Sequence, residues 1–292
     1  MTNGNGMKTS LNGAGLNAGK LSFAQFVELA ARHGFDGVEF GIGGAQKLAD
    51  DQFGGDANGV RDFLAEKNVV PGSFGLDVEW RKDDEAFASG LSALSGKAAF
   101  AQAIGATRCC TWMPPAVNDD LAAWESQTVA RFRQVARVLG DRGVRFGLEW
   151  VGPRHVREGP TAMGKNPWIH TLDGTLALIR EIGEPNVGLL VDSYHCYSTG
   201  VAENTLAGLS DDQIVHVHIN DAPKGVGPDA VRDGERVLPG AGDINLAAFL
   251  SGLRRAGYSG FIAAEVLAPQ PLADDPETAA ARVRAALKTV GL

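Results

Sequence analysis

Four apolar segments of the chain end on an acid or a histidine, the side-chain types that bind metal ions and move protons. They run from Val144 to Glu149, from Gly188 to Asp192, from Ile214 to His218 and from Phe261 to Glu265. One acid after a strand usually caps a helix or lies in a solvated loop, but four such endings in one chain indicate a shared site. Carboxylates with one imidazole form a mostly hard ligand set, suited to Mn²⁺, Mg²⁺ or Co²⁺, whereas structural zinc usually has thiolates. The pattern therefore predicts a divalent metal site at these segment ends.

Two histidines, His216 and His218, compete for a place in this site. Residues two apart on a strand point to the same face, so parity alone allows either one. His218 lies nearer the carboxyl end of its segment, where Glu149 and Asp192 also lie. We expect His218 to face the site and His216 to lie one layer deeper, as a satisfied core histidine or a hydrogen-bond partner of a ligand carboxylate.

The segments that must position these residues are unbroken apolar runs, which are typical of strands buried on both faces of a parallel α/β sheet. Eight strands alternate with helices, at about 8–16, 37–40, 69–76, 107–112, 144–150, 188–195, 214–219 and 261–266. Between the second and third, the sequence predicts a Gly-rich stretch at 41–45 and one helix at 58–67, and Asp243 is the expected cap of a helix at 244–256.

This alternation has no Pro/Ser-rich linker, so it predicts a single (β/α)₈ TIM barrel, residues 8–292, with its chemistry at the carboxyl ends of the strands. The Asn/Gly-rich residues 1–7 are expected to form a poorly ordered tail. A doubly wound sheet is the competing fold, but residues 12–15, Asn-Gly-Ala-Gly, lack the G-x-G-x-x-G phosphate loop.

Composition narrows the class of protein further. The 292 residues are 44% hydrophobic, enough for a large core, and the net charge of −8 without a basic stripe disfavours nucleic acid. Three cysteines, at 109, 110 and 196, give no disulfide framework. No secretory leader or run of about 18 apolar residues is present. We expect a soluble cytoplasmic protein that binds a small molecule rather than nucleic acid or membrane, and a homo-oligomer is left open.

The motifs resemble those of the xylose-isomerase-like TIM barrels, which include ketose 3-epimerases, inosose isomerases and dehydratases, and endonuclease IV. The resemblance spans nearly the whole chain and is most specific at Leu148-Glu149, Val191-Asp192-Ser193-Tyr194-His195, His216-Val217-His218-Ile219-Asn220-Asp221, Pro239-Gly240-Ala241-Gly242-Asp243 and Ala264-Glu265. It implies one divalent metal ion, Mn²⁺ before Mg²⁺ or Co²⁺, with the ligands Glu149, Asp192, His218 and Glu265.

The resemblance also implies substrate-binding residues. It implies that His195 contacts substrate oxygens and that Arg236, before the Pro-Gly turn, reaches the substrate. Two more candidates come from their positions: Trp112 ends the fourth strand, and His155 lies in the long loop 151–170. Loops of this length are usually functional or disordered. Packing at the rim is the alternative role for Trp112.

The chemistry expected of such a site is proton transfer beside a carbonyl. A cation held by a carbonyl and a neighbouring hydroxyl acidifies the intervening C–H and stabilises the enediolate. The resemblance to ketose 3-epimerases implies that Glu149 and Glu265 exchange protons with the substrate carbon. The alternative is that both residues only bind the metal. We expect a sugar or cyclitol isomerase or epimerase.

Two other functions are compatible with the motifs. A dehydratase or lyase would expel a β-substituent from the same enolate of a keto-sugar or inosose. A DNA repair enzyme similar to endonuclease IV is a remote third alternative, because its trinuclear zinc site needs additional histidines and this chain has six in total. Asp233-Gly234-Glu235 also stands where that family places an Asp-x-His pair.

Overall fold

A closed barrel of parallel strands forms the centre of the computed structural model, which describes residues 6–292. The strands adjoin in the order β1-β10-β9-β8-β6-β4-β3-β2, and β1 closes the ring by pairing with both β2 and β10. They are β1 (Lys8–Leu11), β2 (Gly37–Phe40), β3 (Val70–Gly75), β4 (Arg108–Met113), β6 (Arg145–Trp150), β8 (Val187–Asp192), β9 (Ile214–Ile219) and β10 (Phe261–Ala264). The single (β/α)₈ barrel predicted from the sequence is confirmed.

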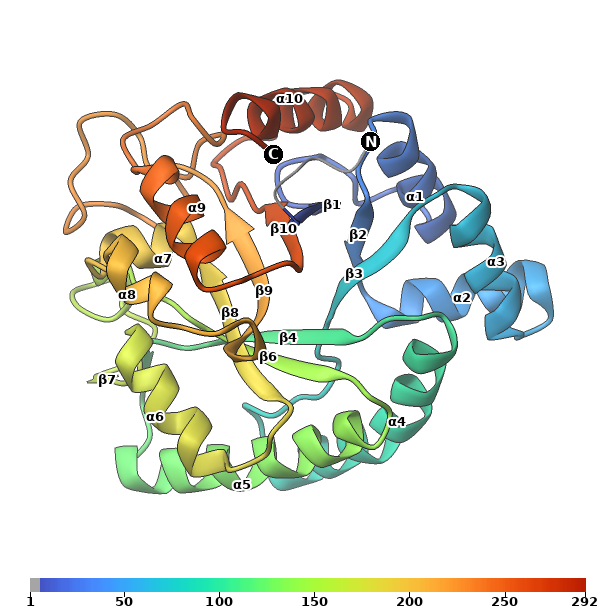
Figure 1. Ribbon diagram of the computed structural model, residues 1–292. Helices are drawn as coiled ribbons and strands as arrows, with labels where there is room; N and C mark the ends of the chain where they lie inside the picture. The colour runs from blue at the N-terminus through green and yellow to red at the C-terminus, as the bar shows by residue number, and fades with distance from the viewer. Residues whose placement is uncertain (1–5) are drawn as a thin grey trace.

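Helices surround the strands on the outside (Figure 1). They are α1 (Phe23–Arg32), α2 (Ile42–Phe53), α3 (Ala57–Glu66), α4 (Asp84–Ala103), α5 (Leu121–Gly140), α6 (Leu172–Ile182), α7 (Ser193–Ser198), α8 (Glu203–Ala207), α9 (Leu246–Arg255) and α10 (Pro276–Thr289), with short 3₁₀ turns η1 (Arg154–Val156) and η2 (Asp211–Gln213). Strands β5 (Ala116–Val117) and β7 (Asn166–Pro167) form a separate antiparallel pair beyond the barrel. Within residues 6–292, no helix is both long enough and apolar enough to cross a membrane.

Two glycines inside the barrel leave space for side chains on the neighbouring strands. Every residue of β8 and β9 is buried, as their unbroken apolar runs predict. Cys110, Leu190 and Val215 form a small cluster in the interior. A Cβ at Gly147 would lie 2.8 Å from the Cys110 Sγ, and a Cβ at Gly188 would lie 3.0 Å from the Val215 Cγ2. Glycine at these two positions leaves room for the cluster on neighbouring strands.

Several local expectations require correction. The Gly-rich stretch at 41–45 belongs to helix α2 and its N-cap Gly41, because the apolar side chains Ile42, Ala45 and Leu48 bury one face of that helix despite its glycines. Asp243 does not cap α9; Asn245 does, accepting from the Ala248 amide at 3.0 Å. Asp243 instead accepts from the Gly225 amide at 2.6 Å.

The ends of two predicted segments also differ from the structure. Strand β1 ends at Leu11, because residues 14–17 form a turn in which Gly15 has φ +73°. Of the predicted tail 1–7, residues 1–5 lie outside the described part of the chain, whereas Met7 is 7% exposed and packs in the core. Packing therefore begins before β1.

Candidate metal centre

The four strand ends predicted to form a site come together on consecutive strands of the barrel. Glu149 lies near the end of β6, Asp192 ends β8, His218 lies near the end of β9, and Glu265 directly follows β10. These strands adjoin in the order β10-β9-β8-β6, and Asp192 is in register with His218. One ligand atom from each residue lies within 4.8 Å of the others.

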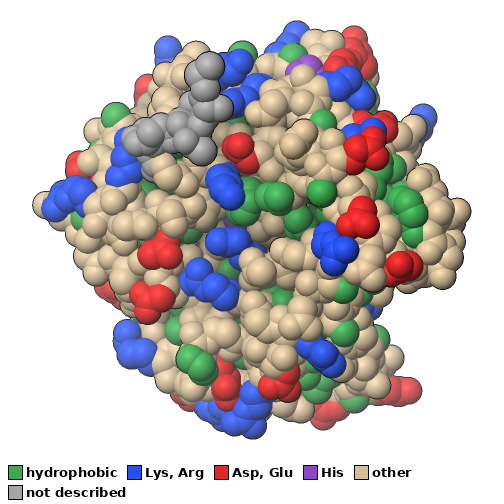
Figure 2. All heavy atoms as spheres, turned by 45° about the vertical axis from the view of Figure 1, so that its right-hand side comes forward, with side chains coloured by type: hydrophobic (Ala, Val, Ile, Leu, Met, Phe, Trp, Pro, Cys, Tyr) green, Lys and Arg blue, Asp and Glu red, His purple; other side chains and the backbone are tan. Residues whose placement is uncertain are grey.

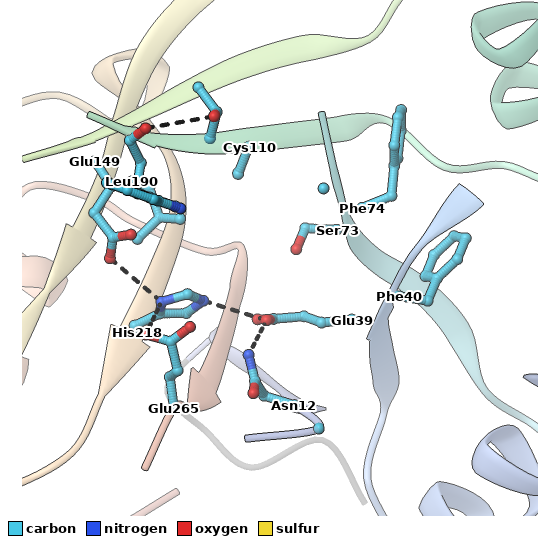
Figure 3. Close-up of a pocket in the computed structure, with 14 residues that line it drawn as sticks. Asn12, Glu39, Phe40, Ser73, Phe74, Cys110, Glu149, Leu190, His218 and Glu265 are labelled. Carbon is cyan, nitrogen blue, oxygen red and sulfur yellow. Dashed lines mark hydrogen bonds and ion pairs between the residues drawn. The ribbon is translucent and has the colours of Figure 1, made fainter. Parts of the chain in front are cut away.

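The imidazole of His218 lies at the middle of this group. Its Nδ1 is 3.4 Å from Glu149 Oε1, 3.4 Å from Glu265 Oε2 and 3.8 Å from Asp192 Oδ2. Figure 3 shows the ring with Glu149 and Glu265 on one side and Glu39 on the other. Glu149 Oε1 and His218 Nδ1 are buried without a hydrogen-bond partner. Buried polar atoms almost always have a partner, so this donor set fits a divalent cation.

Two residues hold the carboxylates in place. Arg236, predicted to reach the substrate, is 2% exposed, and its Nη1 donates to Asp192 Oδ2 at 2.9 Å and to Glu265 Oε2 at 2.8 Å. Its Nη2 donates to Asp233 Oδ1 at 2.8 Å. The amide of Asn220 donates to both oxygens of Asp192, at 3.2 and 3.1 Å. The structure thus places Arg236 against the carboxylates rather than on the cavity wall.

These charges set the protonation of the acids. Burial opposes ionisation of Asp192, but the Arg236 guanidinium and the nearby imidazoles outweigh it and lower the pKa of Asp192. Burial would raise the pKa of Glu265, but His218 and Arg236 outweigh burial and lower this pKa to about 2. At Glu149, burial prevails over His218 and raises the pKa above its ordinary value. The two glutamates therefore have different affinities for a proton.

Glu39, which the sequence reasoning did not single out, joins both histidines. Its carboxylate contacts the His216 Nε2 and lies 3.2 Å from the His218 Nε2. Asn12 Nδ2 donates to the same carboxylate at 2.5 Å. Although Glu39 is buried, the two imidazoles hold its pKa far below the ordinary value. Gly37 to Glu39 has the same form as the four segments above, an apolar strand that reaches an acid, so the signal was present in the sequence.

The partner of His216 is therefore not the one expected from the sequence. His216 lies one layer below His218 and contacts a carboxylate, but that carboxylate belongs to Glu39 and not to one of the four candidate ligands. Because the Nε2 atoms of both rings face Glu39, the carboxylate orients His218 so that its Nδ1 points at Glu149 and Glu265.

A cavity of about 280 Å³ opens beside the four residues. Its lining includes Asn12, Ser73, Phe74 and Trp112. Glu149, His218 and Glu265 also line it, whereas Asp192 is fully buried behind them. Trp112 is 43% exposed, and the Arg81 guanidinium carbon lies 4.2 Å from the centre of its ring. This position allows Trp112 to form one wall for a ligand.

The other two candidates for substrate binding lie outside this lining. His195 is on helix α7 rather than at a strand end, with its Nε2 3.5 Å from the Arg236 Nη2 and 3.9 Å from Glu149 Oε1. His155 is half-buried in η1, close to Arg232 and Asp233. His195 thus adjoins Glu149 and Arg236 without lining the cavity, whereas His155 belongs to the surrounding loops.

Fold and site together define a class of barrel proteins whose ligand-binding residues follow the carboxyl ends of the strands. The chain belongs to the xylose isomerase-like TIM barrel family, whose sequence profile matches residues 27–290. This confirms the family expected from the motifs. The solved structure of a xylose isomerase domain protein from Alicyclobacillus acidocaldarius subsp. acidocaldarius is 33% identical, with a TM-score of 0.87 over 97% of this chain and 98% of that one.

Three curated relatives carry named activities. An inosose isomerase from Bacillus subtilis (strain 168) is 29% identical over 131 residues, 44% of this chain and 42% of that protein. A 3-dehydroshikimate dehydratase from Pseudomonas aeruginosa is 30% identical over 46% of this chain and 19% of its own. An L-ribulose 3-epimerase from Methylomonas sp. (strain DH-1) is 25% identical over 81% of this chain and 75% of its own. The first two matches thus span less than half of each relative, and all three relatives are enzymes.

Proposed function

We propose that the protein is a divalent-metal-dependent isomerase or epimerase of a sugar or cyclitol, which moves a proton on the carbon beside a carbonyl. The observation that carries this proposal is the group of three carboxylates and one imidazole, with two unpartnered polar atoms, three members of which line a cavity. The relatives named inosose isomerase and L-ribulose 3-epimerase support the substrate class.

Glu149, Asp192, His218 and Glu265 would hold the metal ion. Mn²⁺ is the first candidate, and Mg²⁺ or Co²⁺ the next, because the set is rich in carboxylates and has one imidazole. When bound, such an ion supplies a Lewis acid that polarises a carbonyl oxygen and acidifies the neighbouring C–H.

The chain's own residues would carry the protons. Glu149 and Glu265 are the two side chains assigned to this step, one to remove the proton from carbon and the other to return one. Both approach the His218 Nδ1 to 3.4 Å, which brings them to the same small volume. When one carboxylate takes the C–H proton and the other returns a proton to the opposite face, the configuration of that carbon is inverted.

Other residues would orient the substrate. Arg236 fixes Asp192 and Glu265 through its two shared hydrogen bonds and thereby sets the position of the base. Trp112 would stack against the sugar ring at the mouth of the cavity. His195 does not line the cavity and would act on the substrate through its neighbours Glu149 and Arg236. His155 would belong to the loop that surrounds the site.

A dehydratase or lyase is the second candidate function. The relative named 3-dehydroshikimate dehydratase supports it, and the same site would serve, because loss of a β-substituent begins with the same proton removal. The two functions differ only in whether the carbon is reprotonated or a leaving group departs.

One experiment tests the function. Purified protein is incubated in D₂O with ketoses, inososes and 3-keto sugars, with Mn²⁺, Mg²⁺ or Co²⁺ or after chelation, and the products are read by mass spectrometry. We expect turnover only with metal and one deuterium at the carbon that changes. Loss of a water-sized fragment would establish the dehydratase, and full activity of metal-free protein would refute the metal-dependent mechanism.

A further inference from the structure

A second cavity, of about 340 Å³, adjoins the one at the metal centre. The two share Gly13, Glu39 and Phe40 in their linings, so the second begins where β2 ends and runs toward α1 and α2. Ligand sites usually measure about 300 to 1,000 Å³. The first cavity alone, at about 280 Å³, lies just below that range, and the adjoining chamber provides room for a ligand with two parts.

The side chains that line the chamber are mostly apolar. Leu21, Phe23, Phe26 and Phe40 form its walls, and among the described residues that line it, Glu39 is the one ionisable side chain. The Glu39 carboxylate is already engaged by His216, His218 and Asn12. A ligand group that binds in the chamber therefore needs no charge, and burial of its apolar surface contributes to the free energy of binding.

A row of aromatic rings connects the two cavities. The Phe40 ring centre lies 6.2 Å from that of Phe74, which lines the first cavity, and 5.0 Å from that of Phe23, which lines the second. Figure 3 shows Phe40 and Phe74 on neighbouring strands at the side of the cavity away from Glu149. A flat ring attached to a substrate would meet aromatic surfaces along this path.

Glycines keep the chamber open on the α2 side. Gly44 lies in helix α2, where glycine is less favourable than alanine. Packing does not require it, because a Cβ there would meet only the Phe23 Cβ at 3.7 Å, an ordinary contact. At Gly41, which caps the helix, a Cβ would have nothing within 4 Å. The missing side chains leave the space beside Phe23 and Phe40 free.

We propose that this chamber binds a neutral apolar ring carried by the substrate, so that the enzyme acts on an aryl-substituted sugar or cyclitol in preference to the unsubstituted compound. This inference rests on the proposed function for the sugar half of the ligand. The sugar would lie over the four candidate ligands, and its aryl group would pass Phe40 to contact Phe23, Phe26 and Leu21.

Binding of unreactive ligands tests the chamber without relying on turnover. Calorimetry of Mn²⁺-loaded protein compares 4-nitrophenyl β-glucoside with glucose. We expect the aryl glucoside to bind at least about 10-fold more tightly, since burial of a phenyl-sized group exceeds one tenfold step in affinity. Gly44→Leu, which fills the chamber, should abolish most of this advantage.

Gly43→Leu is the matched control. Gly43 is in the same helix turn, is exposed, and does not line the chamber, so this variant should keep the aryl preference. Both variants should melt no lower than wild type, because leucine favours helix over glycine. Equal binding of the two ligands by wild type, or an unchanged preference in Gly44→Leu, would overturn the inference.

Two further outcomes separate the alternatives. If no sugar is turned over but the aryl preference depends on Gly44, the proposed function fails and the chamber assignment stands. If free sugars are turned over and no aryl preference exists, the proposed function stands and the chamber assignment fails. Self-association of wild type that Gly44→Leu abolishes would identify the chamber as a contact between copies of the chain, which also overturns the inference.

Discussion

Glu39 on β2 and His218 on β9 meet across the interior of the barrel, with Glu39 Oε2 3.2 Å from His218 Nε2. Strands β1 and β10 separate β2 from β9 around the ring, so this contact spans the barrel rather than neighbouring strands. A proton on Nε2 is donated to Glu39, which leaves the Nδ1 lone pair directed at the candidate metal site. The contact therefore sets which nitrogen of His218 can bind a metal.

Glu39→Gln should weaken metal binding by about 10-fold or more, the range found when the hydrogen-bond partner of a metal-binding histidine is changed. A carboxylate accepts from both His216 and His218, whereas an amide offers a single acceptor oxygen, so one ring loses its partner. Calorimetry with Mn²⁺ measures the change. Glu79→Gln, which alters an exposed ion pair with Lys82, serves as control, and equal affinities in all three proteins would contradict the positioning role.

Glu149→Gln and Glu265→Gln should each lower kcat by at least about 10²-fold, the lower range for loss of a general acid or base. Each substitution keeps one ligating oxygen, so both variants should retain metal, as atomic absorption would report. One variant should still exchange the proton on its own side, seen as deuterium incorporation without net conversion. Full activity of both variants with metal bound would eliminate the mechanism with two glutamates.

Metal affinity should fall as the pH is lowered from 8 to 6. Burial alone would lower the pKa of His218, but Glu265, Glu39 and Glu149 outweigh burial and raise it above the ordinary value of about 6.5. A raised pKa means that the imidazole holds its proton at higher pH, so protons compete with the metal already above pH 6.5 and more strongly below it. Calorimetry at several pH values measures the trend, and constant affinity from pH 8 to pH 5 would count against His218 as a ligand.

Gly242→Ala should destabilise the loop that carries Arg236. The Asp221 carboxylate accepts from the amides of Gly240, Gly242 and Ile244, at 3.0, 3.0 and 2.8 Å. A Cβ at residue 242 would lie 1.8 Å from the carbonyl oxygen of Ala222, and such overpacking typically costs about 1–3 kcal/mol.

The free energy of unfolding, from urea titration, measures this cost. Gly234→Ala is the control in the same loop, since a Cβ there would have nothing within 4 Å. If the two alanine variants unfold at the same urea concentration, the loop is more adaptable than its hydrogen bonds indicate.

The surface carries mixed charge, and the face in Figure 2 shows acidic and basic side chains interspersed. The net charge of −8 is visible in the sequence, but the positions of individual charges are not. Arg236 illustrates the difference: a loop arginine is usually solvated, whereas this one is buried because three carboxylates surround it. Sequence position gave no indication of that burial.

The fold and the convergence of the four strand ends could be predicted, because apolar runs and their polar ends are local patterns and parallel strands align those ends at one edge. The role of Glu39 could not, since its contact with His218 crosses the barrel and depends on three-dimensional closure. Helix α2 was missed for a related reason. Its glycines lower its intrinsic helix propensity, and packing of Ile42, Ala45 and Leu48 against the core helps to stabilise it.

Closure of the barrel through β1 and β10 has a consequence for biosynthesis. Thr9 on the first strand pairs with Ile262 on the last, so the barrel can close only after the last strand has been synthesised. Three of the four candidate ligands emerge from the ribosome on β6, β8 and β9, and the fourth, Glu265, follows β10. A nascent chain that stops before Phe261 therefore has an open sheet and an incomplete ligand set. Metal binding at the proposed site would therefore follow the final step of folding, after the slow pairing of strands distant in sequence.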